Sequence, residues 1–270
     1  MSKPVVGERR KKNILPNLIL ILCAVFLLVP FIVTVLYSFV RSWTTLLPSG
    51  YTMGFWIKVF AQGKVLPAIG RGLLISVMPV LVTNLIVILA LYTAIVYNPK
   101  LEGFIQSLCM IPNTLKGVII AIPVLSMYAG SPTIFGDRIV MLSCVYCVCI
   151  LPFVYQGIRN NLHAINVKQL LEAAEILGCS RLLAFMKIVV PNMLSGILVS
   201  SLLSVGCIFG DFAIIKIIAG NKYITGQTML FTNRQMLLQQ QCVIVVLMFV
   251  MILILSAVSF ALQNREKRKK

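Results

Sequence analysis

The sequence predicts an all-α membrane protein with six transmembrane helices. Of its 270 residues, 59% are hydrophobic and only 11% are charged, which is too apolar a mixture for a domain that folds in water. Mean hydropathy is +0.98. Apolar runs recur along the chain, and runs of about 20 residues are typical of helices that cross the hydrocarbon core of a bilayer.

These runs set the expected domain organisation. Basic tails over residues 1–13 and 266–270 flank a single transmembrane domain over 14–265. The first run has a basic front and no small-residue cleavage site, so we expect a retained anchor. Two prolines, Pro112 and Pro123, interrupt the third run. The expected spans are residues 14–37, 72–97, 103–127, 139–157, 192–215 and 242–262, and a polar segment over 158–190 separates the fourth from the fifth.

The positive charge is unevenly distributed. The formal net charge is +17, and basic clusters adjoin the first and last apolar runs. With six spans both termini lie on one side, and taking that side as cytoplasmic places most Lys and Arg residues inside, as the positive-inside rule requires. We therefore expect a multi-pass cell-membrane protein with cytoplasmic termini, whose largest internal cytoplasmic segment is residues 158–190. Basic clusters beside spans contact anionic lipid, so no nucleic-acid partner is expected.

Several classes of active site are not expected. The eight cysteines fall mostly within apolar runs, where a free cysteine packs as a small hydrophobe. Cys144, Cys147 and Cys149 lie in mid-span with no histidine nearby in sequence, so we expect no metal and no other cofactor. Seven acidic residues and one histidine, scattered along the chain, do not form a catalytic cluster. A phosphate-binding G-x-x-x-x-G-K-[ST] loop is missing, so any ATP hydrolysis would come from a partner.

The polar segment over 158–190 predicts two short amphipathic helices. Asn166 can cap the first, which we expect over 167–177, and Ser180 can cap the second, over 181–189. Gly178 follows the first helix, where glycine adopts a left-handed backbone without steric cost. Apolar residues recur at helical spacing in the first helix, at Val167, Leu170, Leu171, Ala174 and Leu177. A helix this short is marginal alone, so its apolar face needs a partner: the membrane surface, the rest of the chain or another protein.

The stretch E-A-A-E-I-L-G-C-S-R-L-L-A-F-M-K-I-V-V-P resembles the EAA loop of ABC importer permeases, which reads EAA, three residues, Gly, nine residues, Ile-x-Leu-Pro. Val190 replaces the leucine of the pattern. The residues that match are Glu172, Ala173, Ala174, Gly178, Ile188 and Pro191. The resemblance implies a bacterial type I ABC importer permease fold. It also implies three partners: a cytoplasmic ATPase dimer, a second permease subunit that is homologous or identical, and an extracytoplasmic solute-binding protein.

In that family the EAA loop forms a coupling helix that docks in a cleft of the ATPase. The resemblance assigns this role to Leu170, Leu171, Glu172, Ala173, Ala174, Leu177 and Gly178. The alanines would keep the helix slim, the leucines would be apolar anchors, and the glycine would allow the chain to reverse. A helix lying on the membrane surface is the alternative. Such helices prefer a polar face rich in Lys and Arg, whereas this one offers Glu172, Glu175 and a single Lys168.

The solute is less closely defined. The stretch F-G-D-F-A-I-I-K-I-I-A-G is similar to the branch of the family that serves polyamines, ferric iron, 2-aminoethylphosphonate and sulfate. Lys116 in the third span and Asp211 near the outer end of the fifth either line a solute pathway or have a structural role. The outer loops hold many cations and few acids, which favours an anionic or zwitterionic solute over a polyamine. An ion-coupled secondary transporter is the alternative function, but it would need acidic residues within the spans, where they are nearly absent.

Overall fold

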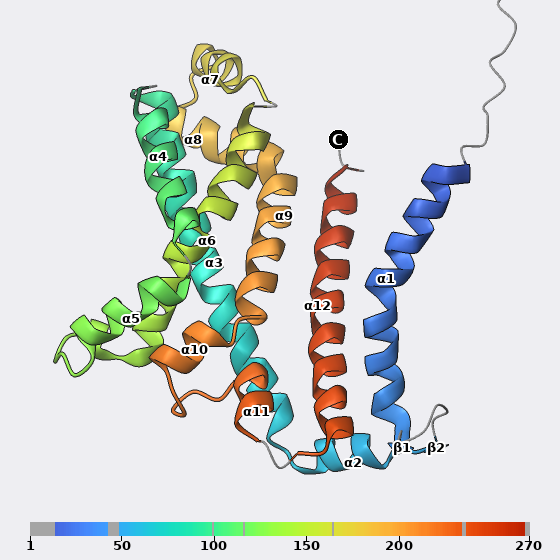
Figure 1. Ribbon diagram of the computed structural model, residues 1–270. Helices are drawn as coiled ribbons and strands as arrows, with labels where there is room; N and C mark the ends of the chain where they lie inside the picture. Colours follow the sequence, from blue (N-terminus) through green and yellow to red (C-terminus); the bar gives the residue numbers. More distant parts are fainter. Residues whose placement is uncertain are drawn as a thin grey trace, which may run out of the picture. The chain divides into compact units, whose positions relative to one another are not determined.

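The structure is a computed structural model that describes residues 14–42, 49–98, 100–115, 117–163, 165–233 and 236–267, and helices make up most of them (Figure 1). The elements in chain order are α1 (Ile14–Phe39), β1 (Val40–Ser42), β2 (Ser49–Tyr51), α2 (Gly54–Ala61), α3 (Val65–Val96), α4 (Lys100–Thr114), α5 (Gly117–Tyr128), the 3-10 turn η1 (Ile134–Gly136), α6 (Arg138–His163), α7 (Val167–Ile176), α8 (Arg181–Ala184), the π-helical turn η2 (Phe185–Val189), α9 (Val190–Phe209), α10 (Ala213–Ile218), α11 (Gly226–Thr232) and α12 (Leu238–Lys267).

The predicted all-α membrane class is confirmed. Within the described residues, five helical stretches are long and apolar enough to cross a membrane, and the bent pair α4–α5 makes six if it crosses as one span. The five stretches are Leu18–Phe39, Val65–Val96, Arg138–His163, Arg181–Phe209 and Leu238–Ala261. A helix of about 20 residues spans the roughly 30 Å hydrocarbon core. Each stretch therefore has at least the length that one crossing requires.

The chain divides into two compact units, of which the smaller comprises the residues up to Val59 together with Met236–Val246. In this unit β1 and β2 pair antiparallel, with Val40 opposite Tyr51. The ring of Phe39 at the end of α1 stacks on Trp56 of α2, with centroids 5.4 Å apart. These contacts hold the end of the first span to the short segment that follows it.

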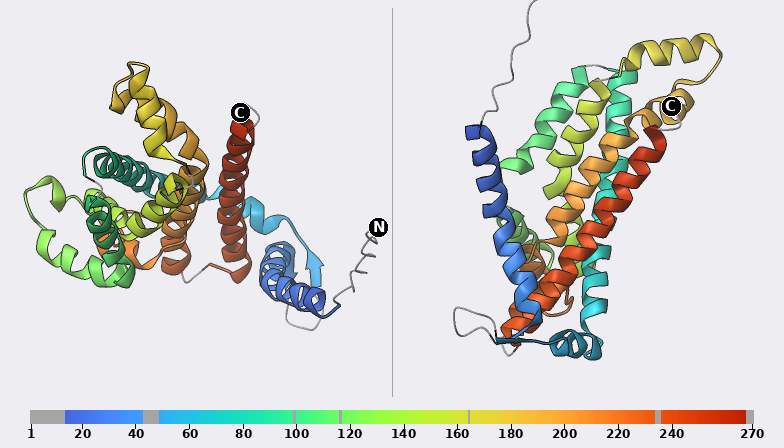
Figure 2. Two further views of the ribbon diagram at one scale, coloured as in Figure 1. Left: turned by 90° about the horizontal axis from the view of Figure 1, so that it is seen from above. Right: turned by 90° about the vertical axis from the view of Figure 1, so that its right-hand side faces the viewer.

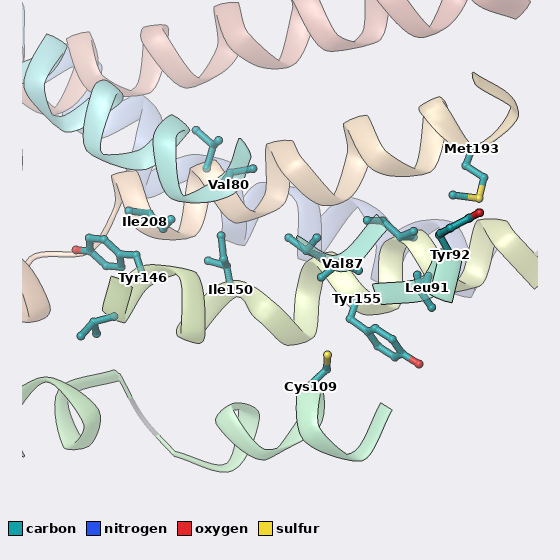
Figure 3. Packing of buried hydrophobic residues seen from close by; sticks show 14 of the residues in the cluster. Val80, Val87, Leu91, Tyr92, Cys109, Tyr146, Ile150, Tyr155, Met193 and Ile208 are labelled. Atoms are coloured by element: carbon teal, nitrogen blue, oxygen red, sulfur yellow. The ribbon is translucent and has the colours of Figure 1, made fainter. Parts of the chain in front are cut away.

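The larger unit comprises Phe60–Gln235 and the residues from Leu247 onward, and its core is formed by α3, α6 and α9. Figure 3 shows residues from the three helices interdigitating, with Val87 of α3, Ile150 of α6 and Ile208 of α9 among them. Small residues bring α6 and α9 close together, because a Cβ at Gly157 would overlap Ser200. Such small-residue contacts are typical of helix packing in membranes, where van der Waals contact replaces the hydrophobic drive.

The third span expected over 103–127 is divided between two helices. These helices, α4 and α5, meet at an angle of 92°. Pro112 has no N–H to donate, and the N–H of Leu115 bonds to the carbonyl of Pro112 (3.2 Å) in a tight final turn of α4. The glycine at 117 permits close contact with α10, because a Cβ there would collide with Ile214. Pro123 lies inside α5 without ending it.

The polar segment expected over 158–190 is shorter in the structure. α6 continues to His163, and α8, η2 and α9 form one helical stretch, Arg181–Phe209. Pro191 sits in the first turn of α9, where it cannot donate to the carbonyl four residues earlier and its ring crowds that carbonyl. The preceding turn, Phe185–Val189, widens to π-helical spacing and avoids this clash. The helix that contains the fifth expected span thus begins before residue 192.

Candidate functional site

The first predicted amphipathic helix forms as α7, over Val167–Ile176. Asn166 occupies the N-cap position, but its side chain makes no hydrogen bond to the helix, so the predicted side-chain cap is wrong. The backbone carbonyl of Asn166 instead accepts from the N–H of Leu170 (3.2 Å). Ser180 likewise precedes α8 without a side-chain cap. The start of α7 therefore depends on tertiary contacts more than on local capping.

The end of α7 is fixed by local sequence. Gly178 has φ +81°, the left-handed backbone that its position past the helix end predicts. Its N–H bonds to the carbonyl of Glu175 (2.9 Å), and the N–H of Cys179 bonds to that of Ala174 (2.9 Å). These two bonds form a Schellman motif, which satisfies the last carbonyls of the helix. The chain reverses sharply here and continues into α8.

The faces of α7 differ from the expected pattern. Leu171 is only 7% exposed, and with Val167 and Ala174 it packs inside this chain. Leu170 is half-buried, while Glu172 and Ala173 face outward. Leu171 is therefore an internal anchor and not one that a partner could reach in this conformation.

The exposed apolar groups lie instead at the tip of α7. Ile176 is 86% exposed and Leu177 is 85% exposed. Leu177 was expected from the sequence and Ile176 was missed, because helical periodicity places residue 176 off the apolar face. The usable signal was local: two large apolar residues stand directly before the glycine that ends the helix. Figures 1 and 2 show α7 at one end of the larger unit, beside α8.

A bidentate ion pair braces the reversal after α7. Arg181 donates through Nε and a terminal nitrogen to the two oxygens of Glu175, at 2.9 and 3.0 Å. Both side chains are about half exposed. An exposed pair adds little stability, but two parallel bonds restrict its geometry. The pair thus orients α7 relative to the first turn of the fifth span.

A second ion pair lies at the end of α6 that leads into α7. Glu102 of α4 accepts from Arg159 Nε (2.9 Å), and His163 Nε2 lies 3.1 Å from the same carboxylate oxygen. Between this cluster and the first turn of α7 is an open cavity of about 480 Å³ that Asn166 and Lys168 also line. His163 is half exposed, and it is also held against a carboxylate from another helix.

Asp211 lies two residues beyond the end of α9, outside the helix in which it was expected. The reason is that α9 ends at Phe209 and the chain turns into the separate short helix α10. The carboxylate accepts from the Tyr146 hydroxyl of α6 (2.8 Å) and from the backbone N–H of Ile214 (3.0 Å). It therefore ties the start of α10 to α6, while a place for Asp211 in the solute pathway stays a prediction.

The other ionisable residue expected in the pathway, Lys116, lies outside the described residues. Its neighbour Gly117 begins α5, which packs against α10. Among the described residues, no group of three or more His, Cys, Asp or Glu side chains is arranged to hold a metal ion. Cys147 donates weakly to the carbonyl of Pro79 on α3 (3.6 Å), a packing contact between spans.

Comparison with known protein families matches residues 86–269 to the binding-protein-dependent transport system inner membrane component family. The match covers more than half of the chain and includes α7, the Gly178 reversal and the spans from α6 to α12. Comparison with curated proteins gave no match. The matching family consists of transport components, and the membrane-spanning helices agree with it. The chain therefore belongs to the family of binding-protein-dependent transport system inner membrane components, as a multi-pass permease subunit of an ABC importer.

Proposed function

We propose that the chain forms the solute pathway of an ATP-driven importer and docks a cytoplasmic ATPase dimer through residues 165–181. One observation carries the proposal: the tip of α7 exposes two large apolar side chains, Ile176 and Leu177, beside a rigid glycine turn. Exposed apolar side chains at a projecting tip favour insertion into a pocket on a partner. Glu172 and Ala173 lie on the outward face of the same helix and would contact the walls of that pocket.

The transport cycle would use α7 as a lever. ATP binding closes the two ATPase subunits, and the docked α7 of each permease moves with them. The internal anchors Val167 and Leu171 transfer that displacement to the spans. The spans then change between inward-facing and outward-facing states, a bistable rearrangement driven by differential binding. A second permease subunit and an extracytoplasmic solute-binding protein complete the assembly.

Co-purification tests the docking surface. In the double variant Ile176→Asp and Leu177→Asp, we expect the ATPase to be lost from the purified complex while the permease remains in the membrane at its normal level. The matched control is Ile134→Asp, because Ile134 is also an exposed apolar residue, 78% exposed, but it lies in η1. Retention of the ATPase by the double variant would exclude the tip as the docking site.

The proposed topology places both termini and α7 in the cytoplasm, where the ATPase is. Single cysteines introduced at residues 172 and 266 should react with membrane-impermeant maleimide only from the cytoplasmic side. A cysteine at Lys222, in the turn between α10 and α11, should react only from the opposite side. Labelling of residue 172 from the outside would overturn the orientation.

For the solute, we propose a small anion or zwitterion such as a phosphonate. The segments assigned to the outer side carry Arg41, Lys58, Lys64, Arg71, Arg138, Lys216, Lys222 and Arg234, against Asp137 and Asp211. Lys64 and Arg71 line an open cavity of about 480 Å³ beside α11, together with Thr232 and Asn233. A positive field of this kind raises the local concentration of anions and repels polycations. Arg138 and Lys216 keep their charge as well, because the Ile218 carbonyl and the Asn221 side chain to which they donate are neutral.

Competition assays on the assembled transporter test the charge of the solute. We expect phosphonates or oxyanions to compete for uptake or to stimulate ATP hydrolysis. Stimulation by spermidine or putrescine, with no effect of the anions, would instead identify a polyamine importer. Sulfate and ferric iron are tested in the same assay.

A further inference from the structure

The last turns of α6 carry three polar side chains on one face. Tyr155, Arg159 and His163 follow one another at four-residue spacing, so they lie one helical turn apart along the side of α6. Glu102 of α4 contacts the last two, at 2.9 Å from Arg159 Nε and 3.1 Å from His163 Nε2. We call Tyr155, Arg159 and His163 the polar ladder. Glu102 contacts two of these three side chains.

The third side chain, Tyr155, is buried and makes no hydrogen bond among the described residues. Tyr155 is 0% exposed, and its hydroxyl has no hydrogen-bond partner in the described part of the chain. Figure 3 shows the ring beside Cys109 of α4. Buried polar groups are nearly always paired, so an unpaired one requires an explanation. A partner that reaches it in a second conformation is such an explanation.

The geometry of α4 allows that second conformation. α4 ends in the sharp bend to α5 and does not run on as a straight span. α5 packs on α10, so the bend divides the segment held by α10 from α4, which runs in another direction. A slide of one helical turn is about 5.4 Å. Such a slide along α6 would move Glu102 from His163 to Tyr155 while Arg159 stays paired throughout.

We propose that Glu102 is a positioning residue that moves along the polar ladder, exchanging His163 for Tyr155 as α7 moves. This inference rests on the proposed coupling function, because the chain passes from His163 to Val167 at the start of α7 within four residues. A displacement of α7 therefore reaches the last turn of α6 first. Through Glu102 it continues to α4 and to the bend between α4 and α5. One-turn shifts of packed elements are an established form of two-state switch.

Pulsed dipolar EPR measures the slide directly. Spin labels replace Leu101 of α4 and Val148 of α6, which are 40% and 41% exposed, in a chain whose eight native cysteines have been replaced. The labels would be about 20 Å apart along α6, so a one-turn slide changes their separation by about 5 Å. Two distance populations are expected, and trapping ATP and vanadate on the ATPase-bound complex should shift weight between them.

Two substitutions should move the populations of the permease alone in opposite directions. Tyr155→Phe removes the hydroxyl that Glu102 would reach after the slide, so it should deplete the state in which α4 has moved by one turn. His163→Ala removes a present partner of Glu102 and should enrich that state. A hydrogen bond to a charged group contributes about 1.5–3 kcal/mol, so each change should alter the population ratio by roughly tenfold or more. Tyr223→Phe is the matched control, because its hydroxyl donates to the Arg71 carbonyl (3.0 Å) far from the ladder.

Opposite shifts in the two ladder variants, with none in the control, would establish the exchange. Shifts of the same sign, or a single distance in every variant, would overturn it, because a merely structural cluster would respond in one direction. The measurement on the permease alone does not depend on ATPase docking. An ATPase that fails to bind would refute the proposed function while leaving the register shift measurable. Retained binding without an ATP-dependent shift would refute the link between Glu102 and α7.

Discussion

Two short helices of the larger unit, α7 and α10, each follow a long span but differ in how far their apolar residues are buried. α10 buries Ile214, Ile215 and Ile218 within its own chain. Both of its ends are satisfied internally, by the Asp211 carboxylate at the start and by Arg138, which donates to the carbonyl of Ile218 (2.8 Å), at the end. α7 buries one face but leaves its tip, Ile176 and Leu177, almost fully exposed.

The difference distinguishes a helix that only stabilises its own chain from one that also offers a surface to a partner. In α10 the charged residues act as caps, and every large apolar group packs inward. In α7 the glycine turn satisfies the backbone, so the side chains at the tip are free to meet another surface. Apolar groups left in water lose about 25 cal/mol per Å² that burial would return, which favours their contact with a partner. The predictions below test this contrast, beginning with the largest expected effect.

Substitution of Gly178 should have the largest effect. Valine at this left-handed position (φ +81°) strains the turn and should abolish ATP-driven transport while leaving the protein in the membrane. The matched control is Gly220→Val just after α10, because Gly220 also has positive φ (+59°) and open space around its Cβ position. It should weaken folding without loss of ATPase binding. Glu172→Lys should resemble Gly178→Val. Normal transport in both coupling variants would remove α7 from the mechanism.

Truncation of one apolar residue in each helix should separate stability from binding. Ile218→Ala creates a cavity in a fully buried site and should destabilise the chain by about 2–5 kcal/mol. Leu177→Ala removes a side chain that is 85% exposed and should leave thermal unfolding in detergent almost unchanged, while weakening ATPase binding. A large loss of stability in Leu177→Ala would mean that the tip packs within the chain after all.

Asp211→Ala should show a smaller loss of stability. The substitution leaves the Tyr146 hydroxyl and the Ile214 N–H without their partner, and because both bonds are only partly buried the total cost should be about 2 kcal/mol, at the low end of the range for such groups. Tyr146→Phe, which removes only one of the two bonds, should cost less. Thermal unfolding checks both values. If Asp211→Asn keeps the stability but abolishes transport, the carboxylate has a pathway role beyond its capping role.

Removal of the exposed ion pair after α7 should have the smallest effect. Glu175→Gln keeps the shape of the side chain and loses the charge that pairs with Arg181, so no measurable change in thermal unfolding is expected. ATPase docking should decrease modestly, because α7 would be less firmly oriented. The control is Lys222→Gln, which removes an exposed charge in the turn between α10 and α11 and should leave ATPase docking unchanged. A clear fall in stability from Glu175→Gln would show that the brace also holds the core.

Features that depend on local pattern could be predicted. Long apolar runs identified the membrane class, because a bilayer of fixed thickness requires helices of fixed length. The EAA stretch identified the family, and Gly178 adopts the expected backbone because its conformation depends only on immediate neighbours. Capping by Asn166 was wrong, since a capping residue type does not ensure that its side chain bonds to the helix. Coupling through α7 stays a prediction.

Features that depend on distant contacts could not be predicted. Hydropathy measures how apolar a segment is but not where the chain changes direction. The expected third and fifth spans therefore each combined parts of two helices, α4 with α5 and α9 with α10. It also could not show that Leu171 faces inward while Ile176 faces out. The sequence by itself determined the class, the family and the local turn. Only the tertiary structure decided which charges meet, as Glu102 meets Arg159 across 57 positions, because such pairing depends on how helices pack and not on their order in the chain.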